Sequence, residues 1–221
     1  MVKVHKALMA AKAEIDHAIV SAEQGTSGEL VVVATPKAGN YSHVEANFAF
    51  TTSLVAFAAA WIWRQRVTVA DWTLATKLSM GVWESCLVLI VGFLLGLLIV
   101  KVFPRIGPAL SSKRFIEAEI ERSAALEFRR FNVARTKSAT GVLIFLAEAE
   151  RRVVVLGDVT IAKEVSDAEW EEVRDIIIAD IRNARPVKGL TEGIARAGEL
   201  LKKHFPGSDE AGDELPSEIH L

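Results

Sequence analysis

Two carboxylates lie at the ends of predicted strands, where they could bind a divalent cation. Asp158 directly follows the apolar run 152–157 and therefore lies at the C-terminal end of a strand, where open α/β sheets often bind ligands. Glu29 begins another apolar run, 29–34. Carboxylate oxygens are favoured ligands of calcium and magnesium. Asp158 and Glu29 are therefore the candidate metal-binding residues, with calcium or magnesium as the candidate cofactor.

Each of these carboxylates also has a purely structural interpretation. Asp158 could satisfy backbone N–H groups in a turn or cap, and Glu29 could be a solvated carboxylate at the end of a strand. If the strands run parallel, Glu29 lies at the opposite edge of the sheet from Asp158. The two side chains would then not share one ion.

The other reactive residue types give no catalytic set. No nucleophile elbow or phosphate-binding loop is present. Thr26 and Ser27 are expected to shape a turn, and the single cysteine, Cys86, lies in an apolar run that excludes a cysteine phosphatase. His204 is expected near a helix C-terminus, where it would interact with the helix dipole. No two histidines are spaced as metal ligands: His5, His17, His43, His204 and His220.

Two apolar runs predict a membrane hairpin. Residues 46–63 carry no charge over 18 positions, and residues 85–100 carry none over 16. Because a spanning helix needs about 20 residues, the runs with their flanks predict transmembrane helices at about 46–63 and 80–101. Gly92 and Gly96 could pack closely against the first helix or a second copy, or face lipid. Four tryptophans are expected to form a belt at the membrane surface: Trp61, Trp63, Trp72 and Trp83.

The distribution of charge suggests an orientation. Five basic residues flank the hairpin on the domain side and three lie in its connecting loop, so the positive-inside rule favours a cytoplasmic domain. Charged residues in the first 24 positions leave no apolar core for a cleavable signal peptide. The expected location is the inner membrane, as a multi-pass protein. The net charge of −2 and the pI of about 6.2 argue against a nucleic-acid partner.

The sequence on both sides of the hairpin predicts an α/β domain. Apolar residues at helical spacing predict helices over 3–24 and 112–132 and from about Lys188. Ser166 and Glu169 have the spacing of a capping box, which starts a further helix. Buried strands are predicted at 29–34, 141–146 and 152–157. The first two should pair in parallel through the helix between them, and the last two should form an antiparallel hairpin.

These elements predict an α/β/α sandwich with a small mixed sheet, plus the inserted two-helix transmembrane hairpin. The first part of the domain is expected at 1–37, the hairpin at 38–108 and the second part at 109–206. Residues 207–221 are acidic and poor in large apolar side chains, so they are predicted to be a disordered tail.

The order of several short motifs resembles the TPM domain family, in a bacterial membrane-bound branch. The resemblance covers about residues 3–35 and 112–206. It rests on these motifs: Thr26 to Val33, Arg135-Thr136 with Thr140 to Phe145, Glu150 to Asp158, Gly189-Leu190, Gly193-Ile194 and His204-Phe205-Pro206. One position departs from the family pattern, because Thr160 stands where members often have glycine two residues after the aspartate. This departure weakens the case for a metal or phosphate site in that loop.

The resemblance implies an α/β/α domain tied to a membrane, in a family whose members include a reported plant acid phosphatase, an animal receptor modulator and bacterial cation binders. The expected function is a membrane-anchored accessory protein that binds other membrane or envelope proteins and lipid, without catalysis. A weak divalent-metal-dependent phosphatase is the alternative. A structural anchor for a homo-oligomer, formed through the transmembrane helices, is a third possibility.

Overall fold

The computed structural model describes residues 2–64, 66–70, 73–77, 80–136, 139–207, 215 and 217–221. They form two compact units. The first unit combines the sequence ranges Met1–Gly39 and Lys113–Leu221, and the second is Asn40–Ser112. The first unit is therefore built from two segments of the chain, and the sequence of the second unit lies between them.

A four-stranded mixed sheet lies at the centre of the first unit, in the order β5-β4-β1-β6. β1 pairs in parallel with β4 and β6, and β4 pairs antiparallel with β5. The predicted parallel pair and the predicted hairpin are therefore both confirmed. The strands are β1 (Glu29–Thr35), β4 (Gly141–Ala147), β5 (Arg152–Gly157) and β6 (Ile219–His220).

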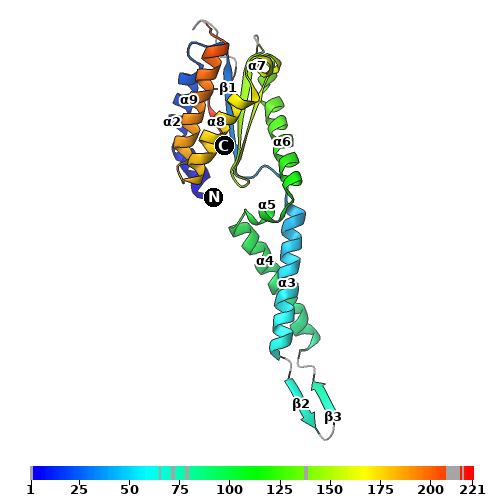
Figure 1. Ribbon diagram of the computed structural model, residues 1–221. Helices are drawn as coiled ribbons and strands as arrows, with labels where there is room; N and C mark the ends of the chain where they lie inside the picture. The colour runs from blue at the N-terminus through cyan, green and yellow to red at the C-terminus, as the bar shows by residue number, and fades with distance from the viewer. Residues whose placement is uncertain are drawn as a thin grey trace. The chain divides into compact units, whose positions relative to one another are not determined.

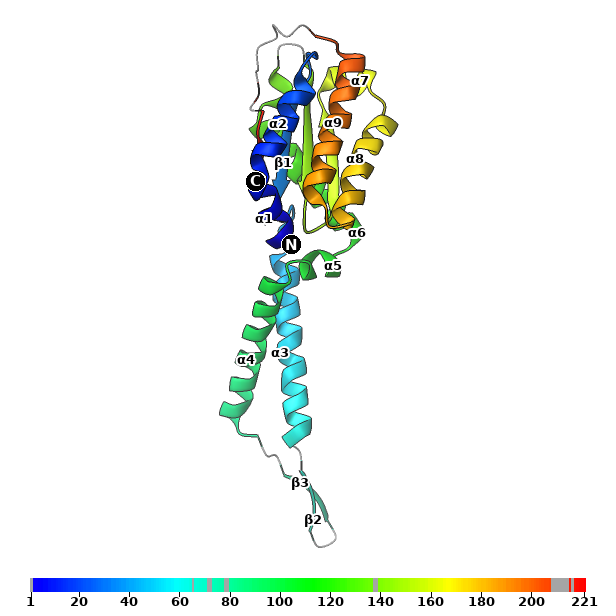
Figure 2. The same ribbon diagram turned by 90° about the vertical axis from the view of Figure 1, so that its left-hand side faces the viewer.

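Helices cover both faces of this sheet, so the predicted α/β/α sandwich is confirmed (Figures 1 and 2). Alternating strand residues divide the core: Leu30 and Val32 face one apolar cluster, and Val31 and Val33 face the other. On the first face lie α1 (Val2–Ala10), α2 (Lys12–Glu23), α7 (Val159–Glu164), α8 (Asp167–Arg182) and α9 (Pro186–His204). On the second lie α6 (Lys113–Arg130) and the 3-10 turn η1 (Val133–Arg135).

Two local predictions in this unit need correction. The helix predicted over 3–24 is divided at Ala11 into α1 and α2. The prediction of a disordered tail is wrong for residues 217–221, because Ile219 and His220 form β6, while residues 208–214 and 216 lie outside the described residues. Composition does not reveal this, because distant contacts hold the segment: Ile219 is buried, and Glu218 pairs with Lys12.

The second unit contains the two apolar helices, which run side by side as a hairpin (Figure 2). α3 (Ser42–Arg64) has 23 residues and α4 (Val82–Val102) has 21, so both are long and apolar enough to cross a membrane. Most of their apolar side chains are exposed, unlike those of a core helix in a soluble protein. The other elements are α5 (Ile106–Leu110) and the antiparallel strands β2 (Arg66–Ala70) and β3 (Thr73–Lys77), a pair that the sequence did not suggest.

The two glycines of α4 face α3. A Cβ atom on Gly96 would lie 2.5 Å from the Cα of Ala49, and one on Gly92 would lie 2.9 Å from the Cα of Ser53. The hydroxyl of Ser53 also donates a hydrogen bond to the Leu89 carbonyl at 2.7 Å. Of the arrangements considered for these glycines, the structure shows close packing against the first helix.

The predicted tryptophan belt at the membrane surface stays a prediction. Trp63 and Trp83 are exposed, and Trp72 lies outside the described residues.

Candidate functional site

Glu29 and Asp158 lie at the same end of the sheet, where β1 and β4 begin and β5 ends. This corrects the prediction that they lie at opposite ends. Glu29 is in register with Gly141, at the start of β4. Asp158 follows β5 and donates its backbone N–H to the Gly141 carbonyl at 2.9 Å. The prediction failed because β5 runs antiparallel to β4, so the end of β5 lies beside the starts of β1 and β4.

Val133 packs on Gly141, the residue next to both of these positions. A Cβ atom on Gly141 would collide with the Val133 carbonyl, so the backbone of η1 lies directly over this glycine. Glu29 and Asp158 flank Gly141 on its two sides. The requirement for glycine here therefore comes from the close approach of η1.

Asp158 caps a helix, as its structural interpretation suggested. Its Oδ1 accepts a hydrogen bond from the Val159 N–H at 2.6 Å, at the start of α7. The side chain is nearly buried, at 7% exposure, and its Oδ2 has no hydrogen-bond partner among the described residues. Thr160 lies in the first turn of α7, where helical backbone needs no glycine. The structural role of Asp158 is thus to cap α7, and its second oxygen is buried without a protein partner in the described part of the chain.

The turn before β1 is built by threonines. Thr26 donates from its hydroxyl to the Phe205 carbonyl at 2.7 Å and accepts from the Gly28 N–H at 3.0 Å. The Thr140 hydroxyl donates to the Ser27 carbonyl at 2.6 Å. These contacts fit the predicted turn-forming role.

Within the described ranges, no group of three or more His, Cys, Asp or Glu residues could hold a metal ion, and the calcium or magnesium site stays a prediction.

The predicted capping box is present at the start of α8. The Glu169 carboxylate accepts hydrogen bonds from the Ser166 backbone N–H at 3.1 Å and from its hydroxyl at 3.0 Å. Lys203 and His204, in the last turn of α9, also contact Glu169. Lys203, helped by Ser166 and His204, lowers the pKa of Glu169 to about 2. This cluster therefore ties the start of α8 to the end of α9.

The other end of the sheet, where β1 and β4 stop, holds a buried acidic residue. Glu148 directly follows β4 and is only 4% exposed. The Nδ1 atom of His5, on α1, lies 2.9 Å from its Oε1. Burial raises the pKa of Glu148, and the hydrogen bond from His5 opposes that rise. Neither residue was a candidate in the sequence, because a contact over 143 positions leaves no local pattern.

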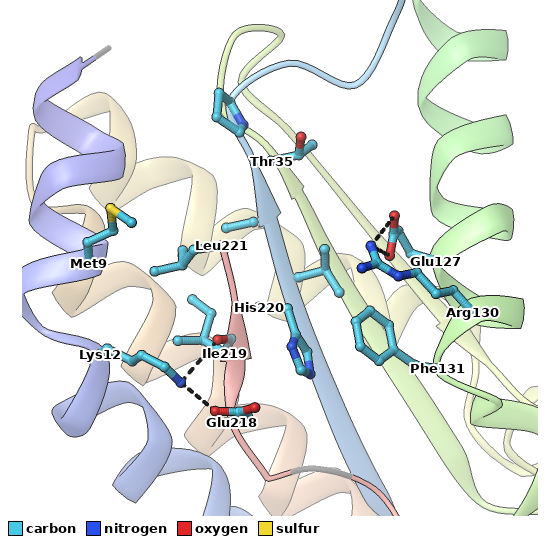
Figure 3. Close-up of a pocket in the computed structure, with 13 residues that line it drawn as sticks. Met9, Lys12, Thr35, Glu127, Arg130, Phe131, Glu218, Ile219, His220 and Leu221 are labelled. Atoms are coloured by element: carbon cyan, nitrogen blue, oxygen red, sulfur yellow. Dashed lines mark hydrogen bonds and ion pairs between the residues drawn. The ribbon is translucent and has the colours of Figure 1, made fainter.

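An open cavity of about 640 Å³ lies near this end of the sheet, beside β1 and β6 (Figure 3). Its polar side chains come from α2, α6, the segment around β6 and Thr35 at the end of β1. Phe131 stacks on the His220 ring, with 4.1 Å between ring centroids. The lining residues are Met9, Lys12, Val33, Ala34, Thr35, Pro36, Glu127, Arg130, Phe131, Glu218, Ile219, His220 and Leu221.

Charge in this cavity is partly paired. Lys12 donates to a Glu218 carboxylate oxygen at 2.8 Å, a bond that raises the pKa of Lys12 and lowers that of Glu218. Arg130 pairs with Glu127 at 3.2 Å. Burial lowers the pKa of His220, which favours the neutral ring. The cavity thus combines an apolar wall, a planar ring and a lysine that binds a carboxylate.

Comparison with known proteins agrees with this fold. The family model for the TPM domain matches residues 110–200. A solved structure, the NMR structure of BA42 protein from the psychrophilic bacterium Bizionia argentinensis, is similar with a TM-score of 0.53 and 22% identity, over 96% of this chain and 92% of that one. A search of curated proteins found no match. Residues 110–200 of this chain are therefore similar to the TPM domain, and the solved structure supports the fold.

Proposed function

We propose that the chain is a membrane-anchored TPM-domain accessory protein that acts by binding other membrane or envelope proteins. One observation carries this proposal: two exposed apolar helices form a unit of their own in the sequence between β1 and α6. The hydrophobic effect would place these helices in lipid. A domain whose two halves both connect to the hairpin would then stay at the membrane surface, where its partners are concentrated.

The orientation is part of the same proposal. The soluble unit would face the cytoplasm, because the basic residues flanking the hairpin outnumber those of its connecting loop. The protein would lie in the inner membrane with both helices spanning it. Cysteine labelling from each side of the membrane tests this, with single cysteines at Lys6 and at Met80 in a chain whose Cys86 is replaced by serine.

Affinity purification from solubilised membranes tests the binding function. We expect the full chain to retain specific membrane proteins, and we expect Asp158→Ala to retain the same set, because Asp158 lies away from the cavity beside β6. A full chain that is inserted in the membrane but retains no specific partner would contradict the proposal.

A second candidate function is a weak divalent-metal-dependent phosphatase. The observation that favours it is the Oδ2 atom of Asp158, which is buried and has no hydrogen-bond partner among the described residues. A cation bound there would stabilise the folded chain, and the stabilisation would grow as the cation concentration rises above the dissociation constant. A calcium- or magnesium-dependent rise in melting temperature that Asp158→Asn removes, together with metal-dependent hydrolysis of a phosphate ester, would favour this function over the first.

A further inference from the structure

β5 forms an open edge of the sheet, because the strand order β5-β4-β1-β6 leaves it without a neighbour on its outer side. The Asp158 N–H bonds to the Gly141 carbonyl before β4, and the direction of the backbone groups alternates along an antiparallel strand. Val153 and Val155 therefore turn their N–H and C=O groups outward, where no other part of the described chain bonds to them. These groups are a template for one more strand.

The sequence of β5 does not protect this edge. Edge strands usually carry a charge, a proline or a bulge that hinders further pairing. Residues 153–157 contain no charged residue and no proline, and β5 pairs with β4 without a bulge. Val154, Val155 and Leu156 are only partly buried. A further strand would therefore cover apolar surface as well as bond to the backbone.

A groove of about 150 Å³ crosses this edge near the start of β5. Its lining residues come from α6, β5 and α8, and α6 and α8 cover opposite faces of the sheet. A groove lined from both faces passes over the outer side of the strand, so neither helix covers β5 there. Glu117 and Glu121 of α6 form one wall, and Arg174 of α8 lies on the other.

The two walls differ in how their charges are paired. Arg174 contacts two acidic residues of its own helix, at 3.4 Å in each case. Glu121 is exposed and forms no ion pair in the described part of the chain, and Glu117 has one long contact, at 3.8 Å, to Arg152. The α6 wall therefore carries uncompensated negative charge, and a basic side chain is the group that complements it.

A second copy of the chain fits this edge poorly. Two β5 strands related by a twofold axis would run antiparallel, and the acidic walls of the two α6 helices would lie side by side. Thr35, where the chain leaves β1 toward α3, is level with Arg152 at the start of β5. Two such copies would continue toward their hairpins at opposite ends of the joined sheet, whereas hairpins in one membrane need the same end. A segment of another protein has neither problem.

We propose that the outer edge of β5 binds an extended segment of a membrane-protein partner, which adds to the four-stranded sheet as a further strand. Successive side chains of such a strand face opposite sides of the sheet. Those on one side meet Val155 and α8 and should be apolar. Those on the other side meet the acidic wall of α6 and should include a lysine or an arginine. This inference rests on the proposed function and gives it a surface and a partner chemistry.

The test uses the full chain in detergent micelles and the fluorescent peptide Val-Thr-Val-Lys-Val-Thr-Val, whose valines share one side and whose lysine lies on the other. We expect this peptide to bind and Glu121→Lys to weaken its binding about tenfold, because the reversed charge replaces an attraction by a repulsion. A peptide with glutamate in place of lysine should reverse this order. The matched control is Glu192→Lys, outside the groove and 50% exposed, which makes the same change of charge and should leave binding unchanged.

Methylation of the peptide amides tests strand addition without altering the protein. An added strand bonds to β5 through alternate amides only, so methylating one alternate set should abolish binding and methylating the other should leave it. Equal effects of the two sets would overturn the site, as would a full chain that keeps its thermal unfolding transition but does not bind the peptide. A dimer formed through β5 in place of peptide binding would also overturn it. Each of these results leaves the proposed function standing if the full chain still retains membrane proteins, which separates the two failures.

Discussion

At the scale of single residues, the pair of His5 and Glu148 has the largest predicted effect on stability. The Glu148 side chain is 1% exposed and that of His5 is 24% exposed. Removing one partner of a buried hydrogen-bonded pair strands the other, at a cost of about 1–3 kcal/mol. We therefore expect His5→Ala to lower the free energy of unfolding by that amount and Glu148→Gln to change it by less than about 1 kcal/mol, because glutamine still accepts from His5.

The pH dependence of the His5→Ala variant checks the cause. A carboxyl group whose pKa is raised by burial favours its protonated form in the folded protein. The stability of the variant should therefore be highest below the ordinary glutamate pKa of 4.5 and should fall as the pH rises through the raised pKa of Glu148. Denaturant unfolding at several pH values measures this. An equal loss at every pH would show that the pair acts only by packing.

His220 gives a second prediction at this scale. Its pKa is lowered by burial and by Lys12 and Arg130, while Glu218 and Glu127 oppose the shift. Attachment of residues 217–221 should be complete above the ordinary histidine pKa of 6.5 and should weaken as the pH falls from there to the lowered value. Hydrogen exchange of the Ile219 amide measures it. His220→Phe, which keeps a ring against Phe131, should remove this pH dependence, and an unchanged profile would assign it to another group.

At the scale of elements, the α3–α4 hairpin depends on small residues. Gly96→Ala places a Cβ atom 2.5 Å from the Ala49 Cα, so the helices must separate. We expect a loss of about 1–3 kcal/mol in the stability of the hairpin in detergent, the usual cost of overpacking. The control is Gly81→Ala, because a Cβ at Gly81 meets nothing within 4 Å. Equal unfolding midpoints for the two variants would contradict the close packing.

At the scale of the whole molecule, the division into two units predicts that the first can fold without the second. Both apolar clusters that pack on the sheet lie in the first unit. We expect a chain in which residues 40–112 are replaced by a flexible Gly-Ser linker to be soluble and to unfold cooperatively. Circular dichroism and sedimentation measure this. Aggregation with each of several linker lengths would show that the hairpin is needed for folding.

Much of this architecture is determined by local sequence pattern. Short β-branched runs bounded by glycine or proline gave β1, β4 and β5, because strands buried on both faces leave a continuous apolar signature. Long uncharged runs gave α3 and α4, and the Ser166–Glu169 spacing gave the start of α8. In each case the residues that decide the structure are neighbours in the chain.

The tertiary structure alone decided which distant residues meet. The antiparallel course of β5 placed Asp158 and Glu29 at one end of the sheet, next to Gly141, on which the Val133 carbonyl packs. Contacts across more than 140 positions joined His5 to Glu148, and contacts across more than 200 joined Lys12 to residues 218 and 219. The reason is physical: hydrogen bonds and ion pairs form between groups that the folded backbone brings within about 3 Å, and no local periodicity records that proximity.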